Sequence, residues 1–315
     1  MTYALNSQLA EQLNALQPRV VSFPNFTPGD AFAWRKRADA LYALVNELLP
    51  ATDGVAAAEL HIPFNGTLLR ARRYSGKTRF SRGLVLYVHG GGGVAGSVNL
   101  YDKIVAQYVK QSGVDFISLE YGLAPETAGH MQTEQVTATL AWLYEHSSQL
   151  DIDPERIVLM GDSGGGGIAA SAALMARDRH LALAGLVLVY PMLDRQVAEV
   201  NPELSPFLTV TADEVKTAWQ ARIGNEISDA LPEYVSPAAA QDLTGLPALF
   251  IDVGDLDLFC QESMRWASRA ASAGVQTECH LYPGVNHGFE LLAPASDIAR
   301  QAISLRCGAI RNMVS

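Results

Sequence analysis

Short, almost wholly apolar runs recur along the chain and alternate with longer segments of helical pattern. An unbroken apolar run of this length indicates a strand that is buried on both faces. We expect such strands at 84–88, 115–119, 157–160, 186–190 and 249–253, with a more alternating last strand at 277–282. Helices are expected between them at 98–112, 132–149, 164–178, 259–274 and 294–311. Strand–helix alternation makes βαβ crossovers, so it predicts a mainly parallel sheet with helices on both faces.

The first strands form a hairpin rather than a crossover. Strand-like runs at 58–64 and 67–74 are separated only by Asn65-Gly66. This dipeptide favours the left-handed backbone of a two-residue hairpin turn. The sheet therefore begins with an antiparallel pair.

Two segments do not fit the alternation. Residues 1–50 show helical periodicity without strands, and residues 191–245 are too long for a simple crossover, although 212–223 reads as a helix. Neither segment is large enough to form a domain of its own. We expect one α/β domain made of 51–190 and 241–315, with 1–50 and 191–240 as helical cap segments over the edge of its sheet.

Composition and charge exclude several classes of protein. The net charge is −10 (23 Lys plus Arg against 33 Asp plus Glu), which disfavours binding to nucleic acid. No apolar run approaches the roughly 18 residues of a membrane span. The three cysteines, Cys260, Cys279 and Cys307, are too few and too far apart for a disulfide framework or a zinc knuckle. With no signal-peptide pattern at the N-terminus, the sequence predicts a cytoplasmic protein without a metal.

Gly161-Asp162-Ser163-Gly164-Gly165 matches the pattern G-x-S-x-G. The motif directly follows the apolar run 157–160 and directly precedes a helical segment, as a nucleophile elbow requires. Glycines on both sides of the serine remove side chains that would collide in so sharp a turn. The alternative is a glycine-rich phosphate loop, but neither G-x-x-x-x-G-K-[ST] nor G-x-G-x-x-G occurs there. Ser163 is therefore the candidate nucleophile.

A second glycine motif, His89-Gly90-Gly91-Gly92-Gly93, follows the strand at 84–88. Consecutive glycines allow backbone N–H groups to turn toward an oxyanion without interference from side chains. We predict Gly91 and Gly92 as two donors of an oxyanion hole and Gly164 as the third. The alternative is a merely flexible loop. His89 is interpreted as a structural residue whose ring steadies the loop.

A serine nucleophile needs a base. His287 lies just beyond the last strand, which brings its imidazole to the carboxyl edge of the sheet, where sites of open α/β folds lie. His280 is inside that strand and is interpreted as a half-exposed strand residue.

The base in turn needs a carboxylate to orient it. Asp252, Asp255 and Asp257 compete for this role after the strand at 249–253. Asp252 falls within the strand, whereas Asp257 lies in the loop, so we prefer Asp257 and keep Asp255 as the second choice. The resulting order, Ser163, Asp257 and His287, is that of the α/β hydrolases.

Taken together, these motifs resemble the hormone-sensitive lipase family of carboxylesterases. The resemblance spans most of residues 80–292 and includes Tyr121-Gly122-Leu123-Ala124-Pro125-Glu126, Ser236-Pro237, Gly245-Leu246-Pro247, Gly254-Asp255-Leu256-Asp257 and His287-Gly288-Phe289. It implies an α/β-hydrolase fold with a mostly parallel eight-stranded sheet and a helical cap. It also implies ester hydrolysis without a cofactor, with Ser163, Asp257 and His287 as the triad and Gly91, Gly92 and Gly164 as the oxyanion hole.

The sequence departs from the family pattern at four positions. Gly164 stands for the usual Ala, Gly93 for a frequent aromatic residue, Gly122 for Arg, and Leu258 for Pro. None of these changes removes a catalytic group.

We therefore expect a serine carboxylesterase that acts on a small ester with a short acyl or an aryl group. An amidase, arylformamidase or lactonase would use the same triad. A small-molecule receptor on a hydrolase scaffold is the alternative from another class, although such a receptor is expected to lack a triad member. The sequence leaves the oligomeric state open, with a homodimer as one option.

Overall fold

Eight strands form one sheet in the computed structural model, which describes residues 3–197, 199–224 and 232–315. The order across the sheet is β1-β2-β4-β3-β5-β6-β7-β8. The strands are β1 (Val55–Phe64), β2 (Thr67–Gly76), β3 (Leu84–Val88), β4 (Asp115–Leu119), β5 (Ile157–Asp162), β6 (Gly185–Val189), β7 (Leu249–Gly254) and β8 (Thr277–Tyr282). Among the described strands, the pairs β1–β2 and β2–β4 are antiparallel, and the other neighbouring pairs are parallel. The predicted eight-stranded, mostly parallel sheet is confirmed.

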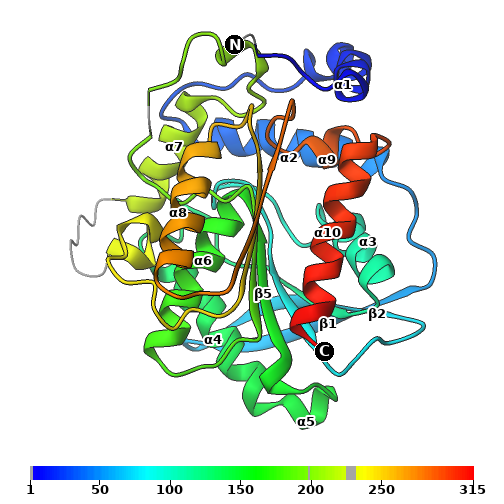
Figure 1. The fold of residues 1–315 in the computed structure, drawn as a ribbon, viewed down its shortest axis with the longest axis vertical. Helices are drawn as coiled ribbons and strands as arrows, with labels where there is room; N and C mark the ends of the chain where they lie inside the picture. Colours follow the sequence, from blue (N-terminus) through cyan, green and yellow to red (C-terminus); the bar gives the residue numbers. More distant parts are fainter. Residues whose placement is uncertain (1–2, 198, 225–231) are drawn as a thin grey trace.

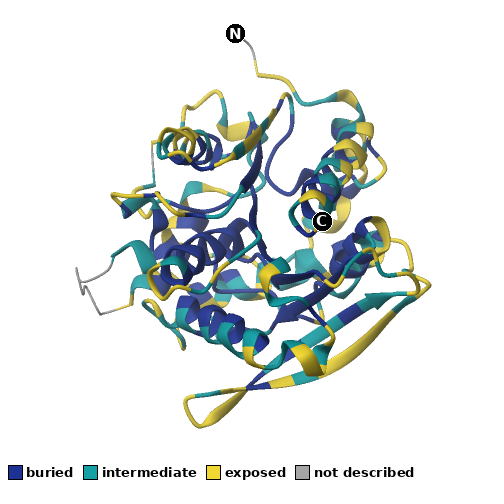
Figure 2. Cartoon of the chain, turned by 60° about the horizontal axis from the view of Figure 1, so that its bottom comes forward, coloured by how far each residue is buried: buried dark blue, intermediate teal, exposed yellow. Residues whose placement is uncertain are grey.

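Helices cover both faces of the sheet (Figure 1). On one face lie α4 (Met131–Glu145), α6 (Ser163–Asp178) and α8 (Cys260–Ser272), and on the other lie α3 (Asp102–Ser112) and α10 (Asp297–Met313). Alternate residues of one strand serve both layers, because Leu84 and Leu86 pack with the first set and Val85 and Tyr87 with the second. Figure 2 shows this layered interior as buried, with exposed residues on the outer faces of the helices. The apolar runs are therefore strands buried on both faces, as predicted.

The hairpin turn between β1 and β2 is confirmed at Asn65-Gly66. Both residues have a positive φ, +46° and +78°, and Phe64 pairs with Thr67 across the turn. The paired strands extend further than the sequence pattern predicts, since the register continues from Val55 opposite Gly76.

The N-terminal segment forms α1 (Ser7–Val20) and α2 (Ala31–Leu48). In Figure 1, α2 runs across the view near the upper ends of the strands, and α1 is seen nearly end-on at the upper right. Side-chain caps begin both helices: the Asn6 side chain accepts the N–H groups of Gln8 and Leu9, and the Asp30 side chain accepts that of Ala33. The helix α2 stops before Pro50, which cannot continue it.

The long insertion contains the predicted helix, α7 (Ala212–Ile223), which begins with a capping box between Thr211 and Glu214. Three short 3-10 turns accompany it at Ser205–Phe207, Pro232–Tyr234 and Pro237–Ala239. Residues 198 and 225–231 of the proposed cap segment lie outside the described residues.

Minor helices complete the chain: α5 (Ser147–Leu150), the 3-10 turn Pro154–Arg156 and α9 (Phe289–Leu292). The helix expected from 98 begins only at Asp102, and the one expected over 132–149 is split into α4 and α5 at His146. Within the described part of the chain, no helix is both long enough and apolar enough to cross a membrane.

Candidate active site

Ser163 stands at the junction of β5 and α6, at the carboxyl edge of the sheet. Its φ of +53° lies in the left-handed region, which is strained for a residue with a side chain. The turn is tight because α6 starts at Ser163 itself and presses against the β3 edge: a Cβ atom on Gly165 would collide with the carbonyl oxygens of Val88 and His89. The sequence pattern G-x-S-x-G therefore folds as a sharp strand-to-helix turn that presents the serine.

Hydrogen bonds connect the three predicted triad residues in one line. Nε2 of His287 lies 2.9 Å from Oγ of Ser163, and Nδ1 of His287 lies 2.7 Å from Oδ2 of Asp257. Ser163 and His287 are each 8% exposed, whereas Asp257 is 2% exposed. The line therefore approaches solvent at Ser163 and His287, and Asp257 is its most deeply buried member. The structure brings these residues together from positions 124 and 30 residues apart in the chain.

The other aspartates near β7 have different partners. Asp255 accepts the backbone N–H of Gly284 at 2.7 Å and so fastens the turn after β8. Asp252 is fully buried and accepts two hydrogen bonds from Arg306, at 2.6 and 3.1 Å. The preference for Asp257 over both alternatives agrees with this geometry.

Aromatic rings and the insertion fix the position of His287. Its ring lies 4.5 Å from the ring of Tyr190 and 5.1 Å from that of Phe259, measured between centroids. The hydroxyl of Thr209, in the insertion, donates to the backbone carbonyl of His287 at 2.6 Å. Burial is the largest single influence on the pKa of His287 and lowers it, but the hydrogen-bonded carboxylate of Asp257, together with Asp162 and Glu290, raises it by more, so the net pKa is raised.

The glycine loop after β3 lies against the elbow. Gly91 and Gly92 have φ of +103° and +62°, a backbone that side chains disfavour. A Cβ atom on Gly164 would meet the backbone of Gly92, so the two elements are in direct contact. Among the described residues, none accepts a hydrogen bond from the N–H groups of Gly91, Gly92 or Gly164. The structure thus brings the three predicted donors close to Ser163, and their N–H groups have no acceptor within the described part of the chain.

His89 lies behind this loop and is fully buried. Its ring stacks on Tyr121 at 4.3 Å, and its Nδ1 lies 2.9 Å from the carbonyl oxygen of Gly90. Burial lowers the pKa of His89 to about 4, so the neutral ring donates that bond at ordinary pH. The tyrosine hydroxyl donates in turn to the carbonyl of His89 at 2.8 Å. These contacts agree with a structural role.

Asp162 is a buried acid that the sequence analysis missed. It accepts the hydroxyl groups of Tyr87 and Tyr101, each at 2.8 Å, and lines the pocket next to Ser163. Burial raises its pKa to about 6. A signal existed, because a charged residue at the end of a strand buried on both faces is rare unless it is paired.

A second buried hydrogen-bond network includes Tyr190, whose ring packs against His287. Arg306 of α10 donates to Asp252 and, at 2.6 Å, to Glu290, which also accepts the hydroxyl of Tyr190 at 2.7 Å. Tyr190 has a positive φ of +34° and donates its backbone N–H to the carbonyl of Asp252. Local periodicity gives no indication of such partners, since they are up to 100 residues apart.

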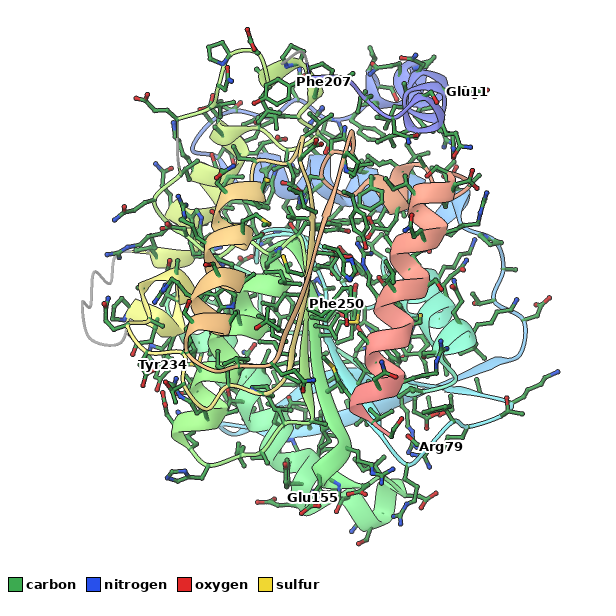
Figure 3. The ribbon with its side chains drawn as sticks, viewed as in Figure 1. Glu11, Arg79, Glu155, Phe207, Tyr234 and Phe250 are labelled. Atoms are coloured by element: carbon green, nitrogen blue, oxygen red, sulfur yellow. The ribbon has the colours of Figure 1, made fainter. Side chains whose placement is uncertain are left out.

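A pocket of about 590 Å³ opens above Ser163 and His287. Its walls are largely apolar and come from α1, α2, the insertion and the loops after β7 and β8. Representative lining residues are Leu13, Leu16, Trp34, Leu41, Phe207, Val215 and Phe259. Phe207 lies near the top of Figure 3, and its ring centroid is 6.3 Å from that of Tyr3, which precedes α1. Both segments that broke the strand–helix alternation therefore line the pocket.

No group of three or more His, Cys, Asp or Glu side chains suited to a metal ion occurs in the described ranges. The three cysteines are free thiols.

Comparisons with known proteins agree with this geometry. A family model described as α/β hydrolase fold matches residues 85–291. The esterase LipI of Mycobacterium tuberculosis is 30% identical over 236 residues, which cover 72% of this chain and 72% of the relative. The carboxylesterase NlhH of the same organism is 32% identical over 227 residues, covering 68% of this chain and 69% of the relative.

Among solved structures, a bacterial heroin esterase superposes with a TM-score of 0.87 at 28% identity, covering 99% of this chain and 98% of the other. The matched range 85–291 includes the glycine loop, the elbow, Asp257 and His287, whereas α1 and α2 lie outside it.

Proposed function

The chain belongs to the α/β-hydrolase family and is a carboxylesterase of the hormone-sensitive lipase type, and from this premise we propose that it hydrolyses small esters with Ser163, His287 and Asp257 as its triad. The observation that carries the proposal is the hydrogen-bonded line from Ser163 Oγ through His287 to Asp257 at the floor of an apolar pocket. A line of this kind supplies a nucleophile, its base and the group that orients the base.

Ser163 attacks the ester carbonyl while Nε2 of His287 takes its proton. Asp257 accepts the Nδ1–H of the imidazole, which selects the tautomer whose Nε2 can act as base, and it stabilises the imidazolium that forms. The raised pKa of His287 is consistent with this stabilisation of its charged form.

Negative charge develops on the carbonyl oxygen in the transition state. The N–H groups of Gly91, Gly92 and Gly164 donate to it, and each such donor contributes roughly 3 kcal/mol of transition-state stabilisation. Helix α6 begins at Ser163, so the positive end of its dipole adds to the same effect.

His287 then protonates the leaving alcohol, and the acyl-enzyme remains on Ser163. A water molecule, activated by the same imidazole, attacks the acyl group and releases the acid. Apart from the ester and water, every group in this cycle is a side chain or backbone N–H of the protein, so the proposed reaction needs no cofactor.

The substrate is a short-acyl or aryl ester. A largely apolar pocket of about 590 Å³ suits a small molecule of this kind, which would be mostly enclosed when bound. Residues 1–50 and 191–240 act as a cap on a catalytic domain made of 51–190 and 241–315. The lining of the pocket by Leu16, Trp34 and Val215 supports the assignment of substrate choice to these segments.

The test is Ser163→Ala, assayed with chromogenic acetyl and butyryl esters. The variant should fold normally and lose at least about a thousandfold in turnover, because the remaining groups supply no nucleophile. Wild-type Ser163 should also be labelled covalently by an organophosphonate. Turnover close to wild type in the variant would exclude the assignment.

Matched ester, amide and lactone substrates, assayed in parallel, distinguish the esterase from its mechanistic relatives. A profile of rate against acyl length then tests the size preference, which is wrong if the rate rises continuously to long chains.

A further inference from the structure

Arg222, on α7 of the insertion, is a buried cation without a counter-ion among the described residues. Its exposed fraction is 1%, and no described carboxylate lies within 4 Å of its guanidinium. One nitrogen, Nη2, donates to the carbonyl of Val235 at 3.2 Å, whereas Nε and Nη1 have no partner in the described part of the chain. Its Cζ lies 4.6 Å from the ring centroid of Trp219.

Such an arrangement is unfavourable for folding, because a guanidinium removed from water needs partners to compensate for its lost hydration. Burial lowers the pKa of Arg222 to about 10, so the group still carries its charge at neutral pH. A charge that persists at the expense of stability calls for a functional explanation.

The position of the guanidinium supplies one. A Cβ atom on Gly93 would lie 2.9 Å from Cδ and 3.1 Å from Nε of Arg222, so the side chain packs directly on the loop that carries Gly91 and Gly92. A Cβ atom on Gly167, the fifth residue of α6, would lie 3.8 Å from Nη1 of Arg222, so the guanidinium also lies close to the N-terminal part of α6. Arg222 therefore lies against both elements that supply oxyanion donors.

The loop is held on its other side as well. The carbonyl of Gly93 accepts the N–H of Ala124 at 2.8 Å and Nε2 of Gln132 at 2.7 Å. Arg222 itself is not among the residues that line the pocket, so it does not bind the substrate directly.

We propose that Arg222 is a positioning residue for the esterase reaction, one whose fixed positive charge acts through the glycine loop and the start of α6 to stabilise the oxyanion. The proposal rests on the function proposed above. It gives the insertion a second role besides shaping the pocket, because α7 also supplies charge to the site.

Chain geometry sets the scale of the effect. Gly93 is one residue from Gly92, about 3.8 Å along the chain, and Gly167 is about one helical turn, 5.4 Å, from Ser163. The guanidinium is thus on the order of 10 Å from the oxyanion. At an effective dielectric constant near 20, a unit charge at this distance changes the rate by about tenfold. The effect falls on the transition state, since the ground-state ester carries no charge there.

The test compares Arg222→Met, Arg222→Lys and a control, Arg265→Met, which removes an exposed arginine from α8. Five quantities are measured for each: kcat, KM, the thermal unfolding midpoint, and the affinities for two inhibitors. One inhibitor is a trifluoromethyl ketone, which adds to Ser163 as a tetrahedral anion, and the other is the uncharged product alcohol.

We expect Arg222→Met to lower kcat by about tenfold and to weaken the binding of the trifluoromethyl ketone by the same factor. Its KM and its affinity for the alcohol should stay within about twofold, and its unfolding midpoint should be equal to or above that of the wild type. Arg222→Lys keeps the charge and should retain most of kcat. Arg265→Met should match the wild type throughout.

A purely structural brace gives a different pattern. The proposal is overturned if Arg222→Met unfolds at lower temperature or fails to fold, if Arg222→Lys loses as much kcat as Arg222→Met, or if Arg222→Met turns over like the wild type. The proposed function fails separately, and visibly, if the wild-type enzyme hydrolyses no ester or if Ser163→Ala does so at the wild-type rate.

Discussion

Oδ2 of Asp257 lies 2.7 Å from Nδ1 of His287, and the remaining oxygen of the same carboxylate accepts the backbone N–H of Phe259 at 2.9 Å. The carboxylate is therefore held from both sides and has one orientation toward the imidazole. Asp255, only two residues earlier, points instead to the N–H of Gly284. Two aspartates of one loop thus bind different groups: Asp257 the imidazole of His287, and Asp255 the backbone N–H of Gly284. Substituting each in turn can therefore distinguish their roles.

Replacing Asp257 by Asn should lower kcat by about 10³–10⁴-fold, because the amide stabilises the wrong tautomer of His287 and cannot stabilise the imidazolium. The matched change Asp255→Asn keeps an oxygen that can accept the N–H of Gly284, so kcat should change by less than about threefold. Steady-state kinetics on one chromogenic ester measures both. Equal losses in the two variants would contradict the assignment of Asp257.

The pH dependence of kcat/KM should show an acid limb governed by His287. Burial disfavours the imidazolium and Asp257 favours it, and the net result is a pKa above the ordinary value of 6.5. Only the neutral imidazole can accept the serine proton, so activity should fall as the pH drops through this raised pKa. A profile from pH 5 to 9 should therefore have its acid midpoint above 6.5. A midpoint clearly below this value would exclude His287 as the titrating base.

The strand layer and the meeting of Ser163, Asp257 and His287 could be predicted because both depend on local signals. An unbroken apolar run identifies a strand buried on both faces, and parallel strands end at one edge, so Ser163, Asp257 and His287 had to converge. Glycines in the sequence also indicate where the chain makes a sharp turn. These patterns need no knowledge of which distant residues touch.

The buried polar partners could not be predicted in the same way. Arg306 on α10 reads as one charge on an amphipathic helix, and nothing local indicates that it pairs with Asp252 and Glu290. Similarly, the sequence pattern does not distinguish Tyr87 from the other core residues of β3, yet its hydroxyl donates a hydrogen bond to Asp162. Such pairs are chosen by three-dimensional packing after the sheet has formed, and local periodicity carries no information on that choice.

The close contact between elbow and glycine loop predicts the effect of Gly164→Ala. The added Cβ would lie 2.3–2.6 Å from backbone atoms of Gly92. Ala is the usual residue of the resembled family at this position, but in this chain the glycine loop lies too close to α6 to accept it without moving. The loop should shift and its N–H groups should leave their positions, so kcat should fall by about 10²-fold or more, as for loss of one oxyanion donor.

Gly308→Ala is the control for this change. Gly308 lies within α10, and a Cβ there meets no atom within 4 Å. Alanine has the higher helix propensity, so this variant should keep its kcat and gain about 0.5–1 kcal/mol of stability. Kinetics and thermal unfolding of both proteins check the pair. Full activity in Gly164→Ala would show that the loop tolerates displacement.

Trp34 of α2 should limit the size of substrate that the pocket accepts. Its ring lies where a Cβ on Gly92 would be, and it lines the pocket next to the glycine loop. Trp34→Leu keeps an apolar side chain but enlarges this space, so kcat/KM for esters with bulkier groups should rise relative to that for acetate. Phe32→Leu, on the same helix, changes an exposed ring (51% exposed) that is outside the pocket lining and should leave the profile unchanged. Rates across a series of acyl lengths and aryl alcohols, measured for the wild type and both variants, give the comparison. If Trp34→Leu loses activity uniformly across the series at unchanged KM, α2 supports the loop without selecting the substrate.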